Sequence, residues 1–180
     1  MIDPAKGTLL ISEPFLEDPN FHRTVILLVE HDSEGSLGFV LNQETPFQLS
    51  DFFDETDWDW LIHIGGPVGK DSLFFVHTLS SLNGAREILP GIFWGGDFEQ
   101  LKFYLQEDLI PKNELRFFLG YSGWGSGQLD QEMRQKSWIV AHAKVEYIFS
   151  TEPELWKRVL REMGGEFSWL SSAPKDPGLN

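Results

Sequence analysis

Cysteine is absent from the 180 residues of the chain. Without a thiol, the chain can form no disulfide bond, carries no cysteine nucleophile and offers no thiolate to zinc or to an iron–sulfur cluster. Such a composition is typical of proteins that stay in a reducing compartment.

Long apolar segments are also missing. The longest runs, at residues 24–29 and 37–41, fall far below the ~20 residues that a membrane-spanning helix requires. The N-terminus, Met1 to Lys6, has no basic region followed by an apolar stretch, so it does not resemble a secretory signal. We therefore expect a cytoplasmic protein with no membrane partner.

Positive charge is scarce. The chain has 14 Lys and Arg residues against 28 Asp and Glu residues, a formal net charge of −14. Proteins that bind nucleic acid through its phosphates need clustered basic side chains. The densest basic group is Lys157, Arg158 and Arg161, and Glu154 and Glu162 flank it at the spacing of ion pairs on a solvated helix face. We expect no direct contact with nucleic acid.

Apolar residues are nonetheless abundant, at 41% of the chain with 14% aromatic, which is too many for a disordered acidic segment. A chain of this length is expected to form one domain. Short strands, hairpins and strand–turn–helix units predict an α+β fold, a single compact domain in which a mixed, partly barrel-like β-sheet is flanked by helices. We place the domain at residues 1–172 and expect residues 173–180, with Pro174, Pro177 and Gly178, to form a loose C-terminal tail.

Two local patterns predict particular elements. Residues 23–30 are apolar and β-branched, and residues 32–35 have turn chemistry, so residues 36–42 are expected to return as the second strand of a hairpin. Asp97 precedes an amphipathic segment, with Gln100 three residues later, which predicts a capped helix to about residue 107.

An acidic, aromatic segment spans residues 44–60 and contains no Lys or Arg. One interpretation is an amphipathic helix and loop that turns its aromatic side chains toward the core. The other interpretation is a docking surface for a basic protein partner. Its aromatic residues are Phe47, Phe52, Phe53, Trp58 and Trp60.

The segment at residues 65–71 contains Gly69-Lys70, a pair found in phosphate-binding loops. Such a loop requires four residues between its glycines, whereas three separate Gly65 from Gly69. Asp71 stands where a Ser or Thr would hold magnesium, and a strand is expected to follow instead of a helix. We do not expect a nucleotide phosphate site here.

Ser122 and His31 are the two candidates for a catalytic role. Ser122 lies in a motif that resembles a nucleophile elbow, but Trp124 occupies the position of the second glycine, and no base for the serine is evident. His31 adjoins acidic residues, yet no pair of histidines has the spacing of metal ligands on a helix. We lean against an enzyme without excluding one, and we expect no metal and no cofactor.

The glycine-rich turn at residues 123–127 permits two interpretations. Its alternating glycines could direct backbone amides toward an anion at the start of the next helix, or they could simply allow a sharp turn under Trp124. Trp94 and Trp124 each adjoin a glycine turn and either belong to the core or form the wall of a pocket.

A series of short motifs runs along nearly the whole chain. In order they are Leu10-Ile11-Ser12-Glu13-Pro14, Asp18-Pro19-Asn20-Phe21-His22-Arg23-Thr24-Val25, Glu30-His31-Asp32, Gly35-Ser36-Leu37-Gly38-Phe39-Val40-Leu41-Asn42, Gly65-Gly66-Pro67-Val68, Gly120-Tyr121-Ser122-Gly123-Trp124-Gly125, Gly127-Gln128-Leu129, Glu132 and Trp138. With this order and spacing, about residues 7–165 resemble the YqgE/AlgH family, the UPF0301 or DUF179 group of small bacterial proteins. The resemblance implies a compact α+β fold with a mixed sheet flanked by helices, and a cytosolic protein. Some members carry the label "transcriptional regulator", but no settled activity comes with the family, so no catalytic residue is carried over.

The family motifs mark where a ligand or partner site is expected. We interpret the chain as a non-catalytic binding or adaptor protein whose partner is another protein or a small ligand. The alternative is a small-molecule or anion sensor that uses the turn at residues 123–127, and an uncharacterised enzyme is less favoured; the oligomeric state is left open. The candidate binding residues are Asn42, Gly65, Gly66, Pro67, Tyr121, Gly123, Trp124, Gln128 and Leu129.

Overall fold

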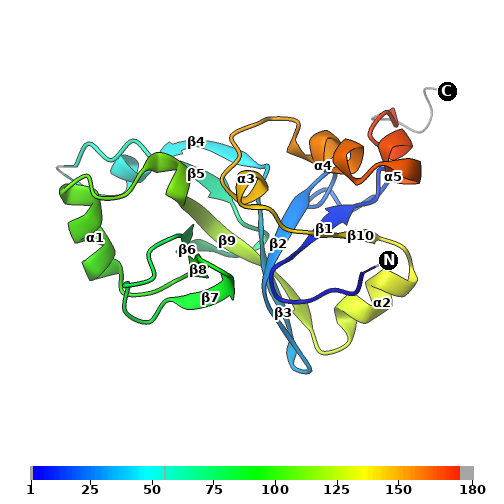
Figure 1. Ribbon diagram of the computed structural model, residues 1–180, viewed down its shortest axis with the longest axis horizontal. Coiled ribbons are helices and arrows are strands. Elements are labelled where there is room, and N and C mark those ends of the chain that lie inside the picture. Colours follow the sequence, from blue (N-terminus) through cyan, green and yellow to red (C-terminus); the bar gives the residue numbers. More distant parts are fainter. Residues whose placement is uncertain (1, 55, 175–180) are drawn as a thin grey trace.

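The computed structural model describes residues 2–54 and 56–174. Its mixed α+β architecture confirms the predicted fold class, and the sheet is not closed (Figure 1). Of the expected C-terminal tail, residues 175–180 lie outside the described residues. The Ala173 and Pro174 carbonyls accept hydrogen bonds from the Arg23 guanidinium at 2.7 and 2.6 Å.

Ten strands of the described residues form one sheet, with the order β10-β1-β2-β3-β9-β6-β8-β7 and with β4 and β5 joined to it through β9. All pairs are antiparallel except β5 with β9. The strands are β1 (Thr8–Ser12), β2 (Val25–Asp32), β3 (Gly35–Val40), β4 (Glu44–Gln48), β5 (Leu61–Ile64), β6 (Val68–His77), β7 (Arg86–Leu89), β8 (Ile92–Trp94), β9 (Leu115–Gly125) and β10 (Trp138–His142).

The helices cover the two halves of this sheet. In Figure 1, α1 lies beside the half built from β4 to β8, whereas α2, α4 and α5 lie beside the half built from β1, β2, β3 and β10. The helices are α1 (Phe98–Gln106), α2 (Gln128–Arg134), α3 (Val145–Ile148), α4 (Leu155–Met163) and α5 (Gly165–Leu170), with 3-10 turns at Leu49–Asp51 and Lys112–Glu114.

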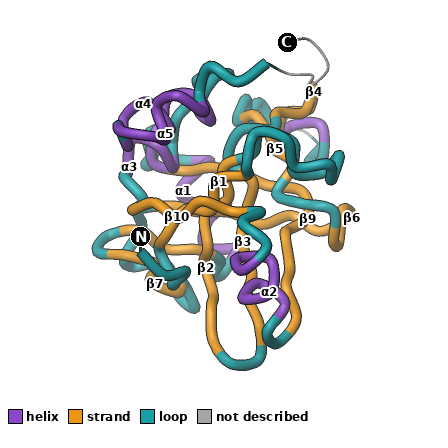
Figure 2. The backbone as a smooth tube through the Cα atoms, turned by 90° about the vertical axis from the view of Figure 1, so that its right-hand side faces the viewer, coloured by secondary structure: helices purple, strands orange, loops and turns teal. Residues whose placement is uncertain are grey.

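Strand β9 belongs to both halves. Its first residues pair with β5 on one side and β6 on the other, and its last residues pair with β3. Figure 2 shows β3 and β9 from the side, with α2 next to them. Because one strand serves both halves, the position of each half is set by the register along β9.

Gly65 makes the change of partners along β9 sterically feasible. Its amide donates to the Leu119 carbonyl at 2.8 Å, and its carbonyl accepts from the Val40 amide at 2.9 Å. A Cβ atom on Gly65 would lie 2.2 Å from the Gly120 carbonyl oxygen, inside van der Waals contact. Only glycine lets the end of β5 approach β9 this closely.

Three apolar clusters form the core. The residues of β1 are all buried, and they alternate between the two faces of the sheet, since Leu9 and Ile11 pack toward α4 whereas Leu10 packs toward α2. The third cluster joins α1 to β5, β6 and the start of β9. Because both faces of β1 are covered, every residue of the strand is buried. The sequence of such a strand is a continuous apolar run, without the alternation of apolar and polar residues that a half-exposed strand shows.

The two local predictions are confirmed in outline. The hairpin forms with β2 and β3, and its strand bounds differ from the expected ones by about two residues. The Asp97 side chain accepts hydrogen bonds from the amides of Glu99 and Gln100 and caps α1. Gln100 does not complete a capping box, since its side chain accepts instead from the Asn83 amide.

The acidic segment at residues 44–60 is not the expected amphipathic helix. It begins as β4 and continues as a 3-10 turn and a loop. Trp58 and Trp60 are buried, as the core interpretation expects, whereas Phe47 and Phe52 are 45% and 47% exposed. The strand forms because Thr45 donates to the Ile62 carbonyl and β4 pairs with β5, a contact that the local pattern does not contain.

Glu132 of α2 ties together the corner between β9 and β10. Its Oε2 accepts from the indole nitrogens of Trp124 at 2.9 Å and Trp138 at 2.7 Å, and its Oε1 accepts from Gln128 at 3.0 Å. Both tryptophans are about 5% exposed or less. One carboxylate therefore satisfies two buried indole donors that would otherwise lack a partner.

Removing this carboxylate should destabilise the protein. Glu132→Ala leaves two buried indole N–H groups unpaired, and we expect a loss of ~2–4 kcal/mol in the free energy of unfolding. The matched control is Asp130→Ala, an exposed carboxylate on the same helix, which should change the free energy by less than ~0.5 kcal/mol. Urea unfolding measures both, and equal losses in the two variants would contradict the assigned role of Glu132.

Candidate ligand-binding cleft

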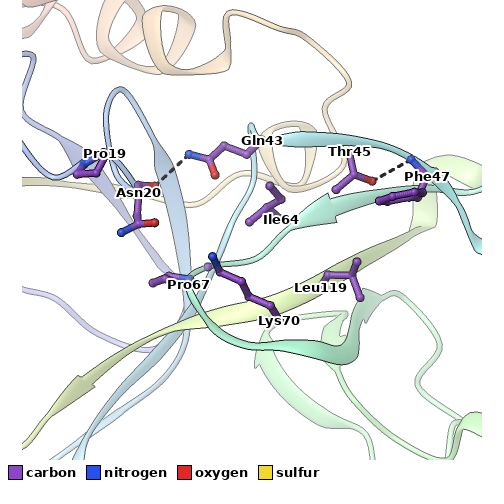
Figure 3. Close-up of a pocket in the computed structure, with 10 residues that line it drawn as sticks. Pro19, Asn20, Gln43, Thr45, Phe47, Ile64, Pro67, Lys70 and Leu119 are labelled. Carbon is purple, nitrogen blue, oxygen red and sulfur yellow. Dashed lines mark hydrogen bonds between the residues drawn. The ribbon is translucent and has the colours of Figure 1, made fainter.

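A cleft of about 310 Å³ opens where the Pro19–Asn20 loop, β4 and the turn between β5 and β6 meet (Figure 3). It lies next to the Gly65–Gly66 segment that the sequence marks as a candidate site. We call it the Lys70 cleft. Its lining residues are Pro19, Asn20, Gln43, Thr45, Phe47, Ile64, Gly66, Pro67, Lys70 and Leu119.

Apolar side chains form much of the cleft surface. Phe47 is 45% exposed and Ile64 is 37% exposed, which is unusual for strand residues of this protein because most of its large apolar side chains are buried. Figure 3 shows Ile64, Pro67 and Leu119 around the same space. Burying this surface against an apolar ligand would be favourable.

Side-chain amides form the rim. The Gln43 amide nitrogen donates to the Asn20 main-chain carbonyl at 3.0 Å, and Asn20 is held in turn by Asp18 through its amide at 2.8 Å and its side chain at 3.1 Å. These bonds fix the rim and leave each side-chain amide oxygen without a partner among the described residues. The rim can therefore accept hydrogen bonds from a ligand.

Lys70 supplies the only charge of the lining. The pairing of β6 with β9 passes from Val68–Tyr121 to Leu73–Leu119 with a shift of register, so the residues between them leave the ladder. Lys70 is exposed on this bulge, and in Figure 3 its side chain extends between Pro67 and Ile64 toward the rim. Within residues 2–54 and 56–174 its ammonium makes no hydrogen bond or ion pair.

Two of the predicted site residues line the Lys70 cleft, Gly66 and Pro67. Gly65 lies directly behind them and is buried in the contact with β9. Tyr121 packs against Phe74, with ring centroids 5.8 Å apart. Asn42 connects two segments instead of facing a ligand, because its side chain accepts from the Val25 amide and donates to the Arg23 carbonyl, both at 2.8 Å.

The other four predicted residues belong to the corner around α2 and do not line the cleft. Trp124 and Leu129 are buried in the core cluster on that face. Gln128 accepts from the Gly125 amide at 3.0 Å, so this amide of the glycine-rich turn already has a partner. Gly123 and Gly125 lie within β9, opposite Leu37 and Gly35 of β3, so only the last two residues of this segment form a turn. The anion site at residues 123–127 stays a prediction.

Ser122 and His31 have local partners. Ser122 is fully buried, and its hydroxyl donates to the Gly65 carbonyl at 3.1 Å. The Nδ1 atom of His31 lies 2.7 Å from the Ser36 hydroxyl across the hairpin. Ser122 therefore links β9 to the segment after β5, and His31 links β2 to β3.

The described residues show neither a membrane-spanning helix nor a metal cluster. In the described part of the chain, no helix is long and apolar enough to cross a bilayer. The same residues contain no cluster of three His, Asp or Glu side chains arranged to hold a metal ion.

The sequence marked the turn but not the residues that give the cleft its chemistry. The sequence points to Lys70 only as part of a phosphate loop. Asn20 belongs to a family motif without being a candidate binding residue, and Gln43 carries no recognisable functional signal. Their convergence depends on the pairing of β4 with β5 and on the bulge in β6. The one local signal is the polar interruption Gly69–Ser72 inside an otherwise apolar strand.

Comparison with known proteins places the chain in a family. The sequence profile DUF179, described as AlgH-like, matches residues 9–168. A UPF0301 protein of Chlorobaculum tepidum is 44% identical over 179 residues, which cover 97% of this chain and 95% of that protein. A UPF0301 protein of Cytophaga hutchinsonii is also 44% identical, with 97% and 98% of the two chains covered.

Two solved structures have a similar fold. The crystal structure of a protein from Corynebacterium diphtheriae is similar with a TM-score of 0.78 at 24% identity, covering 96% of this chain and 94% of that one. The solution structure of the AlgH protein from Pseudomonas aeruginosa has a TM-score of 0.73 at 27% identity, with 97% and 98% covered. With a family profile matching most of its length and close relatives along nearly all of it, the chain belongs to the AlgH-like DUF179 family of UPF0301 proteins.

Proposed function

We propose that this protein is a non-catalytic binding protein whose Lys70 cleft takes a small ligand with an apolar body and a carboxylate. The observation that carries the proposal is the Lys70 ammonium, which has no partner in the described part of the chain and lies beside exposed apolar side chains. An ammonium without a protein partner can bind a ligand carboxylate through a charge-assisted hydrogen bond. Ile64 and Phe47 provide the apolar contact, and the amides of Asn20 and Gln43 orient polar groups of the ligand.

The size and composition of the Lys70 cleft support this proposal. Its volume of about 310 Å³ lies at the lower end of the range of small-molecule sites, about 300–1,000 Å³. Such sites are mostly apolar with a few polar groups that fix orientation. The proposed role is non-catalytic, because Lys70 is the only titratable side chain of the lining and has no second acid or base in the cleft to act with it in proton transfer.

Replacing Lys70 should weaken the binding of apolar carboxylates. We expect Lys70→Met to bind sodium hexanoate about tenfold more weakly than the unmodified protein, because one charge-assisted hydrogen bond is lost. The matched control is Lys102→Met, which removes the same charge from α1. Calorimetric titration measures the affinity of both variants for hexanoate, and hexanamide serves as the uncharged probe. If the unmodified protein bound hexanoate and hexanamide with equal affinity, the proposed role of Lys70 would be excluded.

A second candidate function is that of an adaptor which docks a basic protein segment on the acidic segment at residues 44–60. The observation that favours it is the exposed pair Phe47 and Phe52, whose rings meet edge to face at 5.9 Å. Asp51 and Asp54 are exposed beside them. Aromatic anchors with complementary charge around them are typical of protein interfaces.

A partner held by this segment should be lost when its aromatic anchor is removed. We expect Phe52→Ala to co-purify with at least tenfold less partner from the native host, since a buried aromatic anchor contributes at least ~2 kcal/mol. Phe103→Ala is the matched control, because Phe103 is a 55% exposed phenylalanine on α1. Native mass spectrometry measures the stoichiometry, and equal loss in both variants would argue against docking at residues 44–60.

We also infer that the protein does not bind duplex DNA directly, so that any regulatory role would act through a ligand or another protein. In the densest basic group, Lys157 pairs with Glu154, and Arg158 pairs with Glu152 and Glu162. These carboxylates offset the charge of two of the three cations, and Arg161 donates to the Lys157 carbonyl, so the group offers a phosphate backbone little net positive charge.

A gel-shift experiment with duplex DNA at low ionic strength tests this inference. We expect no retardation at micromolar protein, because the net charge repels the phosphate backbone and low salt leaves that repulsion unscreened. A retarded band that disappears as salt is added would show phosphate contacts and overturn the inference.

A further inference from the structure

A second cavity, of about 240 Å³, lies at the opposite end of β5 from the Lys70 cleft, and the two share no lining residue. The α3–α4 connection contributes Phe149 and Thr151 to its wall. We call it the basic pocket. Its lining residues are Asp59, Trp60, Leu61, His63, Lys112, Leu115, Arg116, Phe149 and Thr151.

The basic pocket gathers buried nitrogen atoms that have no partner. Among the described residues, five buried side-chain nitrogen or oxygen atoms make no hydrogen bond, and four of them belong to Trp60, His63 and Arg116. These residues are 7%, 4% and 5% exposed. Buried polar groups are nearly always paired in native proteins, so a cluster of unpaired ones requires an explanation.

The unpaired atoms are mainly donors. The Trp60 indole nitrogen and the Arg116 Nε can only donate, and a neutral imidazole carries one N–H. Burial and the Arg116 charge lower the pKa of His63 to about 3, so His63 is neutral at pH 7. Backbone groups of Phe117 and Leu61, within weak hydrogen-bonding reach of the ring, counteract part of this shift. Trp60 and Arg116 therefore each hold a donor without an acceptor, whereas the His63 N–H has only weak contacts with the Phe117 and Leu61 backbone.

Arg116 also brings a buried charge without a carboxylate beside it. Its terminal nitrogens donate to the carbonyls of Ile148 at 2.7 Å and Leu41 at 2.5 Å. Burial lowers the pKa of Arg116 to about 10, and Glu44 opposes this through its field without forming an ion pair within the described residues. At pH 7 the guanidinium is still a cation, and a buried cation is costly unless an anion compensates it.

The mouth of the pocket adds a second cation. The Lys112 ammonium lies 5.8 Å from the centroid of the Trp60 ring and pairs with Asp59, and both side chains of that pair are more than half exposed. An exposed ion pair of this kind contributes little stability, so its opening costs little. Lys112 can then turn toward a ligand that enters beside the exposed Leu61.

We propose that the basic pocket is a binding site for a small oxyanion, held by Arg116, the Trp60 and His63 ring N–H groups, and Lys112. An oxyanion has several acceptor oxygens, which can each take a hydrogen bond from one of these donors. It also supplies the negative charge that Arg116 lacks. Water could satisfy the N–H groups, but it brings no charge, so a water-filled pocket would show no response specific to oxyanions.

The test uses the full chain and follows the indole N–H signals by two-dimensional NMR during titration with sodium phosphate or sodium acetate. Sodium chloride keeps the ionic strength constant. Trp60→Phe, which keeps the ring face and removes the donor, identifies the Trp60 signal. We expect that signal to shift with saturation at millimolar oxyanion while the other indole signals stay in place.

Variants then locate the site. His63→Leu and Lys112→Met should each weaken phosphate binding about tenfold in calorimetric titration. Neither removes the Arg116 bonds to Leu41 and Ile148, so both variants should fold. Lys70→Met should leave phosphate binding unchanged, which separates this site from the proposed ligand cleft.

Each outcome decides the proposal. A Trp60 shift with both salts supports a general oxyanion site, and a shift with phosphate alone narrows the ligand to phosphate. An unmoved Trp60 signal, or the same shift with chloride alone, overturns the proposal. Affinity that is unchanged in both His63→Leu and Lys112→Met overturns it as well.

Discussion

The close approach of the Gly65–Gly66 backbone to β9 is the constraint on which the rest of the structure depends. A Cβ atom at either glycine would lie 2.2 Å from backbone atoms of β9, at Gly120 for the first and at Tyr121 for the second. Main-chain bonds from Gly65 to Leu119 and Val40 hold the crossing in place. This crossing adds a link between the two halves beside β9 itself, since Gly65 bonds to β9 on one side and to Val40 at the end of β3 on the other. It also decides where β5 lies, and both cavities adjoin β5.

The two ends of β5 have different chemistry because they face different neighbours. At its C-terminal end, the crossing exposes Ile64 and Pro67 beside the bulge that carries Lys70. The basic pocket begins at the N-terminal end with Trp60 and Leu61 and reaches His63. Parallel pairing sets His63 opposite Phe118, and Arg116 lies over the same phenylalanine ring at 5.9 Å. The Gly65–Gly66 part of the family motif therefore has a structural role. Two of the side chains proposed to bind ligands flank it in the chain, His63 before it and Lys70 after it.

Elements that depend on neighbouring residues could be predicted from the sequence. The β2–β3 hairpin and the Asp97 cap follow from patterns within a few residues, and both occur. The segment at residues 44–60 could not be predicted in this way, because its amphipathic pattern competes with the pairing of β4 with β5.

The same limit applies to the prediction of the two candidate sites. Gly66 and Pro67 were found through their motif, whereas Lys70, His63 and Arg116 acquire their surroundings from strand pairing between segments far apart in the chain. Trp124 was expected beside a pocket or in the core, and its bond to Glu132 in the buried corner agrees with the core interpretation.

An anion must approach this molecule against a net charge of −14. That repulsion acts over about a Debye length and is screened by salt, whereas contacts inside a pocket are screened much less. Short-range donors and a buried guanidinium can therefore hold an anion that the molecule as a whole repels. The overall charge then acts mainly on the rate of encounter, and the local arrangement sets the lifetime of the complex. Because the rest of this acidic surface repels anions, non-specific anion binding is weak. Lys70 and Arg116 can therefore select the anions whose shape and hydrogen-bond acceptors fit their cavities.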